Sequence, residues 1–124
     1  MISGIINSEL EAIVRLWIRG PLREIETEAI VDTGFNGTLV LPPELIAELG
    51  LSLKGRSRGV LANGSVISFP LYEALVFWNG RLLEITVGAT ETKPFIGMSL
   101  LRGSELAMQV TEGGAVSIHE MLLS

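Results

Sequence analysis

The 124-residue chain contains no cysteine, a single histidine and a single aspartate. Without cysteine, it cannot form a disulfide, a thiolate zinc site or a cysteine nucleophile. A histidine-based nucleophile system would need Ser104 or Ser117 together with an acid, and no pattern in the sequence places these beside His119. We therefore interpret His119 as a surface or interface residue near the end of the chain.

Charge and long apolar runs are also scarce. Charged residues make up 19% of the chain, the net charge is −5, and the nine basic residues are scattered, with Arg56 and Arg58 the nearest to a cluster. Phosphate recognition needs clustered Lys and Arg, so no nucleic-acid partner is expected. No apolar run approaches the ~18 residues of a membrane span, and residues 1–7 lack the features of a signal peptide. We expect a soluble, cytoplasmic protein with no membrane partner.

What the chain does contain is a large share of apolar residues. Hydrophobic residues make up 48% of the sequence, and the mean hydropathy is +0.47. The length predicts a single domain over residues 1–124 with a modest core. A dimer that buries a shared surface would account for the apolar surplus.

Most of the sequence has strand character. Residues 11–18 and 23–31 predict a β-hairpin that turns at Gly20-Pro21. In the second strand Glu24, Glu26 and Glu28 recur at every second position, as on one face of a half-buried strand. We interpret these glutamates as a solvated face and not as a metal or acid-base cluster.

Three further turns and two helices complete the predicted elements. Asn63-Gly64 joins strands at 55–61 and 65–76, Asn79-Gly80 joins 71–78 to 81–87, and the turn at 112–114 joins 106–110 to 115–119. A helix is expected over 42–49, with Pro43 early in it and Gly50 as the C-terminal cap. A shorter helical turn is expected from Met98, ending at Gly103. The fold class is therefore mainly β with one or two short helices.

The strongest local motif runs Ala-Ile-Val-Asp-Thr-Gly over residues 29–34. An apolar strand delivers Asp32 directly into a turn, and a strand resumes at residues 38–41. A carboxylate at the end of a buried strand costs free energy unless it is hydrogen-bonded or functional. Thr33 offers a hydroxyl, and Gly34 lets backbone N–H groups approach the carboxylate closely. Asp32, Thr33 and Gly34 are therefore the candidate catalytic residues.

Three segments in order resemble the retropepsin-like aspartic proteases, and in particular single-domain bacterial members. Asp32-Thr33-Gly34, preceded by two apolar residues, resembles their active-site loop. Residues 95–101, Phe-Ile-Gly-Met-Ser-Leu-Leu, resemble the segment that crosses behind the active site and leads into a helix. Residues 61–65 occupy the place of the flap, the hairpin that closes over bound peptide. The resemblance covers residues 29–101.

The resemblance implies a closed β-barrel of the acid-protease fold and a role for each motif. Thr33 would bond across a two-fold axis to the partner loop, and Gly34 would shape the loop. Ala62, Asn63 and Gly64 would form the flap tip and offer backbone groups to an extended substrate. The termini of related dimers interleave, so residues 1–7 and 117–123 are expected at the interface. No metal and no cofactor are implied, and the role of Ser99 is left open.

The chemistry requires two chains. Aspartic proteolysis uses two carboxylates that share a proton, one activating water and the other polarising the scissile carbonyl. Asp32 is the only aspartate, so a homodimer must supply the second one, most simply across a two-fold axis. The expected function is an aspartic-type endopeptidase, a hydrolase acting on peptide or protein substrates.

Two other interpretations remain open. The chain could be a catalytically silent, dimeric peptide- or protein-binding module with the protease fold, because a fold does not settle function. It could also be an unrelated small β-barrel interaction domain.

Overall fold

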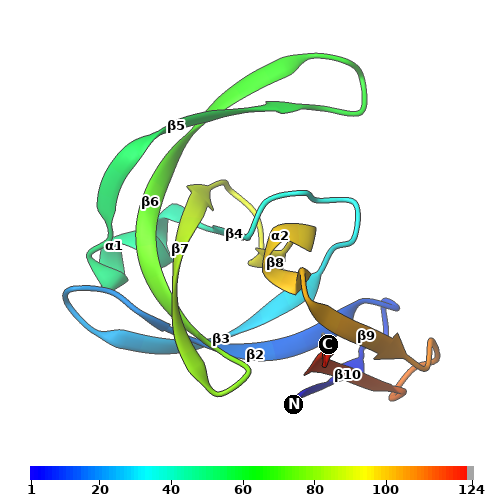
Figure 1. Ribbon diagram of the computed structural model, residues 1–124. Helices are drawn as coiled ribbons and strands as arrows, with labels where there is room; N and C mark the ends of the chain where they lie inside the picture. The colour runs from blue at the N-terminus through cyan, green and yellow to red at the C-terminus, as the bar shows by residue number, and fades with distance from the viewer. Residues whose placement is uncertain (123–124) are drawn as a thin grey trace.

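The computed structural model describes residues 1–122 as ten strands and two short helices (Figure 1). In chain order these are β1 (Ile2–Ile6), β2 (Ala12–Arg19), β3 (Glu24–Val31), β4 (Leu39–Leu41), α1 (Pro43–Leu49), β5 (Ser52–Val60), β6 (Val66–Trp78), β7 (Arg81–Ala89), β8 (Phe95–Ile96), α2 (Met98–Leu101), β9 (Ser104–Met108) and β10 (Ala115–Glu120). The prediction of a mainly β chain with one or two short helices is confirmed. Neither of these helices is long and apolar enough to cross a membrane.

All ten strands belong to one sheet, in the order β5-β6-β7-β4-β8-β3-β2-β1-β10-β9. β6 also pairs with β2, through Ile18 opposite Val76 and Arg19 opposite Leu75. Strand pairing therefore runs from β2 through β6, β7, β4, β8 and β3 and returns to β2. The β2–β6 link spans only two residue pairs, and the expected closed barrel stays a prediction.

The predicted turns contain Asn and Gly residues at the positions where the backbone has a positive φ angle. Asn79 and Gly80 join β6 to β7 with φ angles of 51° and 78°, and positive φ at both central residues is the condition for the tightest hairpin turn. Gly64, between β5 and β6, has φ 85° and Gly113, between β9 and β10, has φ 79°. Each of the hairpins predicted from the sequence is confirmed.

Both predicted helices are present. Pro42 precedes α1, and Gly50 follows it with φ 71°, donating its N–H to the carbonyl oxygens of Ile46 and Ala47. Ile46 and Leu49 turn into the core. α2 is a single turn that begins after Gly97 and is followed by Gly103 with φ 85°.

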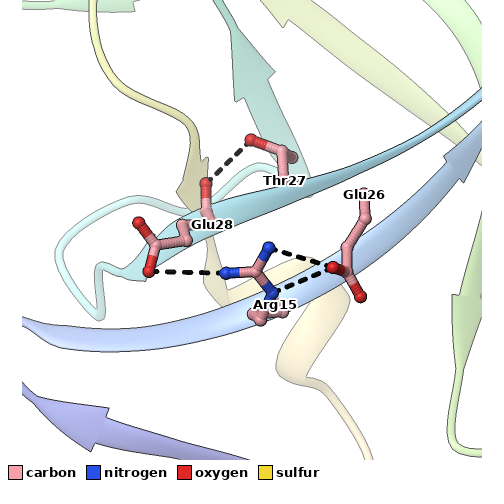
Figure 2. Close-up of polar contacts among 4 residues, drawn as sticks. All are labelled: Arg15, Glu26, Thr27 and Glu28. Carbon is pink, nitrogen blue, oxygen red and sulfur yellow. Dashed lines mark hydrogen bonds and ion pairs between the residues drawn. The ribbon is translucent and has the colours of Figure 1, made fainter.

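Strand alternation divides β2 between the core and solvent. Val14, Leu16 and Ile18 are buried, whereas the intervening side chains face outward. On the outer face, Figure 2 shows Arg15 reaching two glutamates of β3, with Nη2 2.9 Å from Glu26 Oε1 and Nη1 3.7 Å from Glu28 Oε2. Exposed ion pairs of this kind contribute at most about 1 kcal/mol each. The interpretation of these glutamates as a solvated face is confirmed.

The two ends of the chain pair with each other. β1 pairs with β2 on one side and with β10 on the other, and β10 lies between β1 and β9. Both backbone edges of β1 and β10 are thus occupied within one chain. This differs from the expectation that residues 1–7 and 117–123 interleave with a partner; residue 123 lies outside the described part of the chain.

Candidate active site

The end of β3 fixes the position of Asp32. β3 pairs in parallel with β8, Ile30 opposite Phe95 and Val31 opposite Ile96. The pairing continues one residue further, because the Asp32 N–H donates to the Ile96 carbonyl oxygen at 2.9 Å. A two-residue strand from the far end of the sequence therefore anchors the backbone of the candidate catalytic residue.

The carboxylate of Asp32 is half-buried and held by its own loop. Its Oδ1 accepts the backbone N–H of Gly34 at 2.9 Å, and the Asp32 carbonyl oxygen accepts the N–H of Phe35 at 3.1 Å. The sequence predicted that a backbone N–H group would approach the carboxylate at Gly34, and the group that does so is the N–H of Gly34 itself. Thr33 is exposed, and its hydroxyl forms no side-chain hydrogen bond with any residue in 1–122.

Residues 97–99 hold the loop between β3 and β4, residues 32–38, which we call the Asp32 loop. The N–H of Met98 donates to the Phe35 carbonyl oxygen at 2.7 Å, and the N–H of Ser99 donates to that of Gly37 at 3.1 Å. The Ser99 hydroxyl donates to the carbonyl oxygen of Asn36. Ser99, whose role the sequence left open, thus clamps the loop that carries the aspartate.

Removing the Ser99 hydroxyl is expected to loosen this loop. Ser99→Ala loses one side-chain hydrogen bond and should lower the free energy of unfolding by about 1 kcal/mol. Any cleavage rate should fall as well, since catalysis depends on the position of the carboxylate. Urea unfolding and peptide cleavage would be measured together, with Ser99→Thr as the variant that keeps a hydroxyl. Equal behaviour of the alanine and threonine variants would contradict the clamp.

Asp32 borders a cleft of about 760 Å³. Its floor comes from the Asp32 loop, β4 and β7, and its roof comes from the β5–β6 hairpin. Asp32 and Arg58 are the charged residues on its lining, and three phenylalanines, Phe35, Phe69 and Phe95, contribute aromatic surface. A cleft with one carboxylate and mostly uncharged walls suits a largely apolar ligand that presents a few polar groups to the carboxylate.

Figure 1 shows the β5–β6 hairpin arching over the loop that follows β3. At its tip, Leu61 and Ser65 close the turn through a 2.8 Å backbone hydrogen bond, and Asn63 Oδ1 accepts the Ser65 N–H at 3.0 Å. Ala62, Asn63 and Gly64, the predicted flap residues, are all exposed at this tip. The residues that line the roof of the cleft are further back, and include Gly59, Val60, Ile67 and Phe69.

Phe69 is seated between two glycines. A Cβ atom on Gly59 would lie 3.3 Å from Phe69 Cε1, and one on Gly88 would lie 2.9 Å from Phe69 Cε2. The ring therefore fills the space that side chains at both positions would need. The sequence analysis missed Phe69, although its inward position follows from strand alternation along β6 once the pairing with β5 and β7 is known.

No protein-family model matches the chain, and no curated protein matches it. Among solved structures, the chain is similar to a retropepsin-like aspartic protease from Rickettsia conorii, with 16% sequence identity and a TM-score of 0.59. The similarity covers 97% of this chain and 90% of that protein. It confirms, at the level of the fold, the resemblance carried by the three sequence motifs: the chain has the fold of a retropepsin-like aspartic protease.

Proposed function

We propose that the chain is one half of a homodimeric aspartic endopeptidase that hydrolyses peptide bonds. The observation that carries the proposal is the position of Asp32. Its carboxylate follows the buried residues Ala29 and Ile30 at the end of β3, has one oxygen held by the Gly34 N–H and borders a 760 Å³ cleft under a hairpin. The fold around it is shared with an aspartic protease.

Hydrolysis would proceed through a water molecule between two Asp32 side chains. The ionised carboxylate takes a proton from the water as the water oxygen bonds to the scissile carbonyl carbon. The protonated carboxyl group donates its proton toward the carbonyl oxygen. Collapse of the tetrahedral intermediate breaks the C–N bond, and the amine leaves with a proton from the pair. One chain supplies one of the two carboxylates, so the active unit is a dimer. The proposed mechanism uses no metal and no cofactor.

Thr33 and Gly34 would organise the pair. Thr33 is exposed, and its hydroxyl has no side-chain hydrogen bond within residues 1–122, so it is available to bond to the partner loop across the two-fold axis. Gly34 keeps its N–H on the Asp32 carboxylate. Together they would hold the two carboxylates in one plane, which is the geometry needed to share a proton.

An extended peptide would bind between the β5–β6 hairpin and the cleft floor. The hairpin tip at Ala62, Asn63 and Gly64 would supply backbone groups to the peptide, as in strand addition. Closure of the hairpin would exclude water from the carboxylate pair. The ring of pairings among β2, β6, β7, β4, β8 and β3 would serve as a closed barrel that keeps the floor rigid during this motion.

The test is cleavage of a mixed peptide library, read by mass spectrometry from acidic to neutral pH, with wild type and Asp32→Asn in parallel. The proposal expects defined cuts from the wild type and none from the variant. If neither protein cuts at any pH while both remain folded dimers, the catalytically silent binding module becomes the better interpretation.

Phe69 is expected to limit the size of a substrate side chain. Phe69→Ala removes the ring that lies over Gly88 and should enlarge the cleft beneath the hairpin. In the same peptide library, the variant should accept larger aromatic side chains at one position beside the cut. Because large-to-small changes of a phenylalanine cost about 3 kcal/mol or more when fully buried, thermal unfolding would be measured alongside. An unchanged cleavage preference in a folded variant would contradict this role.

A further inference from the structure

One face of β6 and β7 continues from the cleft to the outside of the molecule. The two strands pair antiparallel without a register shift, and paired residues point to the same side of a sheet. Leu71 and Gly88 are such a pair and line the cleft. Three further pairs follow on the same face, which are Glu73 with Thr86, Leu75 with Glu84, and Phe77 with Leu82. A peptide chain that leaves the cleft beside Leu71 can therefore continue along this face.

The outer end of this face carries large apolar side chains that are exposed. Phe77 is 39% exposed, Leu82 is 37% exposed, and β2 adds Trp17, which is 47% exposed. The pairing of Arg19 with Leu75 brings the outward residues of β2 beside those of β6. Accordingly, Cζ of Arg19 lies 5.3 Å from the centre of the Phe77 ring. We call Trp17, Phe77 and Leu82 the outer apolar patch, and a cluster of exposed aromatic and aliphatic side chains is typical of a contact surface.

A cavity of about 370 Å³ lies between the cleft and the outer apolar patch. Its lining includes Arg19, Leu75 and two glutamates, Glu73 and Glu84. Lys54 neutralises the first of these, because its Nζ lies 3.1 Å from Glu73 Oε1. Glu84 forms no ion pair with any residue in the described range 1–122. Its carboxylate is therefore free to bind a basic group of a partner.

The charges beside the outer apolar patch also favour a basic partner. Arg15 lies between Glu26 and Glu28 (Figure 2), and Arg19 bonds to Glu24. With the groups around the cavity included, the face holds five acidic and three basic side chains, hence a net charge of −2. Opposite charge on a partner steers its approach and suppresses acidic competitors.

We propose that this face is an exosite, a substrate-binding surface outside the active-site cleft, for proteins with a basic and apolar segment away from the bond that is cut. The inference rests on the proposed function, because the segment and the cut bond belong to one substrate chain. Side chains two positions apart share one face of an extended chain. A segment in which a Lys or Arg stands two positions from a Leu would therefore reach Glu84 and cover the outer apolar patch together.

Peptides that share one cut site, found with the peptide library, test the exosite in the active protein. A Gly-Ser spacer of six residues follows the cut site, because Phe77 lies six positions from Leu71 along β6, about 20 Å in an extended strand. One peptide ends in the tail Lys-Ser-Leu-Ser-Leu-Ser-Lys, a second has glutamate in place of both lysines, and a third has no tail. A second set carries spacer and tail before the cut site. In one of the two orders the lysine tail should lower KM roughly tenfold through the second contact and leave kcat unchanged. The glutamate tail should give no gain.

Two substitutions assign the gain to this face. Glu84→Lys reverses the free carboxylate and should raise KM for the lysine-tail peptide roughly fivefold to tenfold. Trp17→Thr removes an exposed ring, keeps a residue that favours strands, and should raise the same KM roughly threefold or more. Neither change should alter KM for the peptide without a tail. Glu44→Lys, at an exposed position of α1, is the matched control and should keep the full gain. Thermal unfolding would confirm that each variant is folded.

Binding can also be measured without cleavage. The chain has two tryptophans, and Trp78 is only 3% exposed, so acrylamide quenches the fluorescence of Trp17 preferentially. In the Asp32→Asn protein, the lysine-tail peptide should reduce this quenching, because the leucines of the tail would cover the exposed ring. The glutamate-tail peptide at the same concentration should leave the quenching unchanged.

The inference is overturned if the lysine tail gives no advantage over the glutamate tail in either order, or if it leaves Trp17 as accessible as before. It is also overturned if Trp17→Thr loses the dimer in sedimentation velocity, because a second copy would then cover this face. Its failure is distinct from failure of the proposed function. Cleavage that ignores the tails refutes the exosite alone. Protection of Trp17 by the lysine tail in a protein that cleaves no peptide supports the binding surface and refutes the proteolysis alone.

Discussion

Asp32→Asn is expected to abolish peptide cleavage, reducing the rate by at least about a thousandfold, in the range lost with a general acid-base group. The fold should persist, because an asparagine side-chain oxygen can still accept the Gly34 N–H that Oδ1 accepts at 2.9 Å. Initial rates on a peptide cut by the wild type would be compared at matched dimer concentration. Glu44→Gln, which removes an exposed carboxylate from α1, is the control and should cleave normally.

Mixing the two proteins tests the requirement for a pair. Excess Asp32→Asn added to a fixed amount of wild type should form mixed dimers and suppress cleavage beyond the effect of dilution. Retained activity in the purified variant, above the level of a mock preparation, would show that another group performs the chemistry. Activity of mixed dimers equal to half that of the wild type would show that each chain acts alone.

Gly97→Ala is expected to destabilise the protein more than any other single methyl addition proposed for this chain. A Cβ atom at residue 97 would lie 2.2 Å from the Gly37 carbonyl oxygen and 2.6 Å from Phe35 Cδ2. Backbone must move to relieve the first contact, so we expect a loss of about 3 kcal/mol in the free energy of unfolding. The displaced residues belong to the Asp32 loop, and cleavage should fall with stability. Urea unfolding measures the first effect and peptide cleavage the second.

Gly55→Ala provides the matched control. It makes the same chemical change on β5, where a Cβ atom would meet nothing within 4 Å, and should leave both properties nearly unchanged. If Gly97→Ala were as stable and as active as Gly55→Ala, close packing of residue 97 against the loop would not matter for either property.

The elements that could be predicted from the sequence are those governed by local chemistry. Asn79-Gly80 and Gly50 adopt the positive φ angles that their residue types favour, and the alternation of Glu24, Glu26 and Glu28 placed one face of β3 in solvent. The order of strands in the sheet could not be predicted from the sequence. β4 and β8 are three and two residues long, which is too short for a residue pattern that would indicate their partner strands. β1 could not be predicted either, because its five residues are too few to show an alternating pattern and no turn motif marks them as a strand.

The sequence predicted the central residues of the candidate site but not the residues that line the cleft around them. Asp32 and Gly97 belong to two motifs that stand in the order of the resemblance, and residues 96–99 bond to Asp32 and the loop after it, behind the candidate site, as the resemblance implied. Ile67 and Phe69 are apolar residues on a strand, and such residues usually belong to the core. Their position under the hairpin depends on the curvature of β5 and β6, which the sequence does not reveal. The clamp formed by Ser99 depends on a hydrogen bond to Asn36, a residue far away along the chain.

The pairing of β3 with β8 also sets the order of events during folding. Ile30 pairs with Phe95, and the loop after β3 is held by residues 97–99, so the ribosome must release most of the domain before the aspartate acquires its geometry. Contacts between such distant residues form slowly, since a long loop has to close first. A nascent chain that has not yet reached Pro94 would therefore carry the aspartate on an unsupported strand end. The loop that carries Asp32 and the cleft beside it can therefore take their final shape only once the segment from Pro94 to Ser99 has been made.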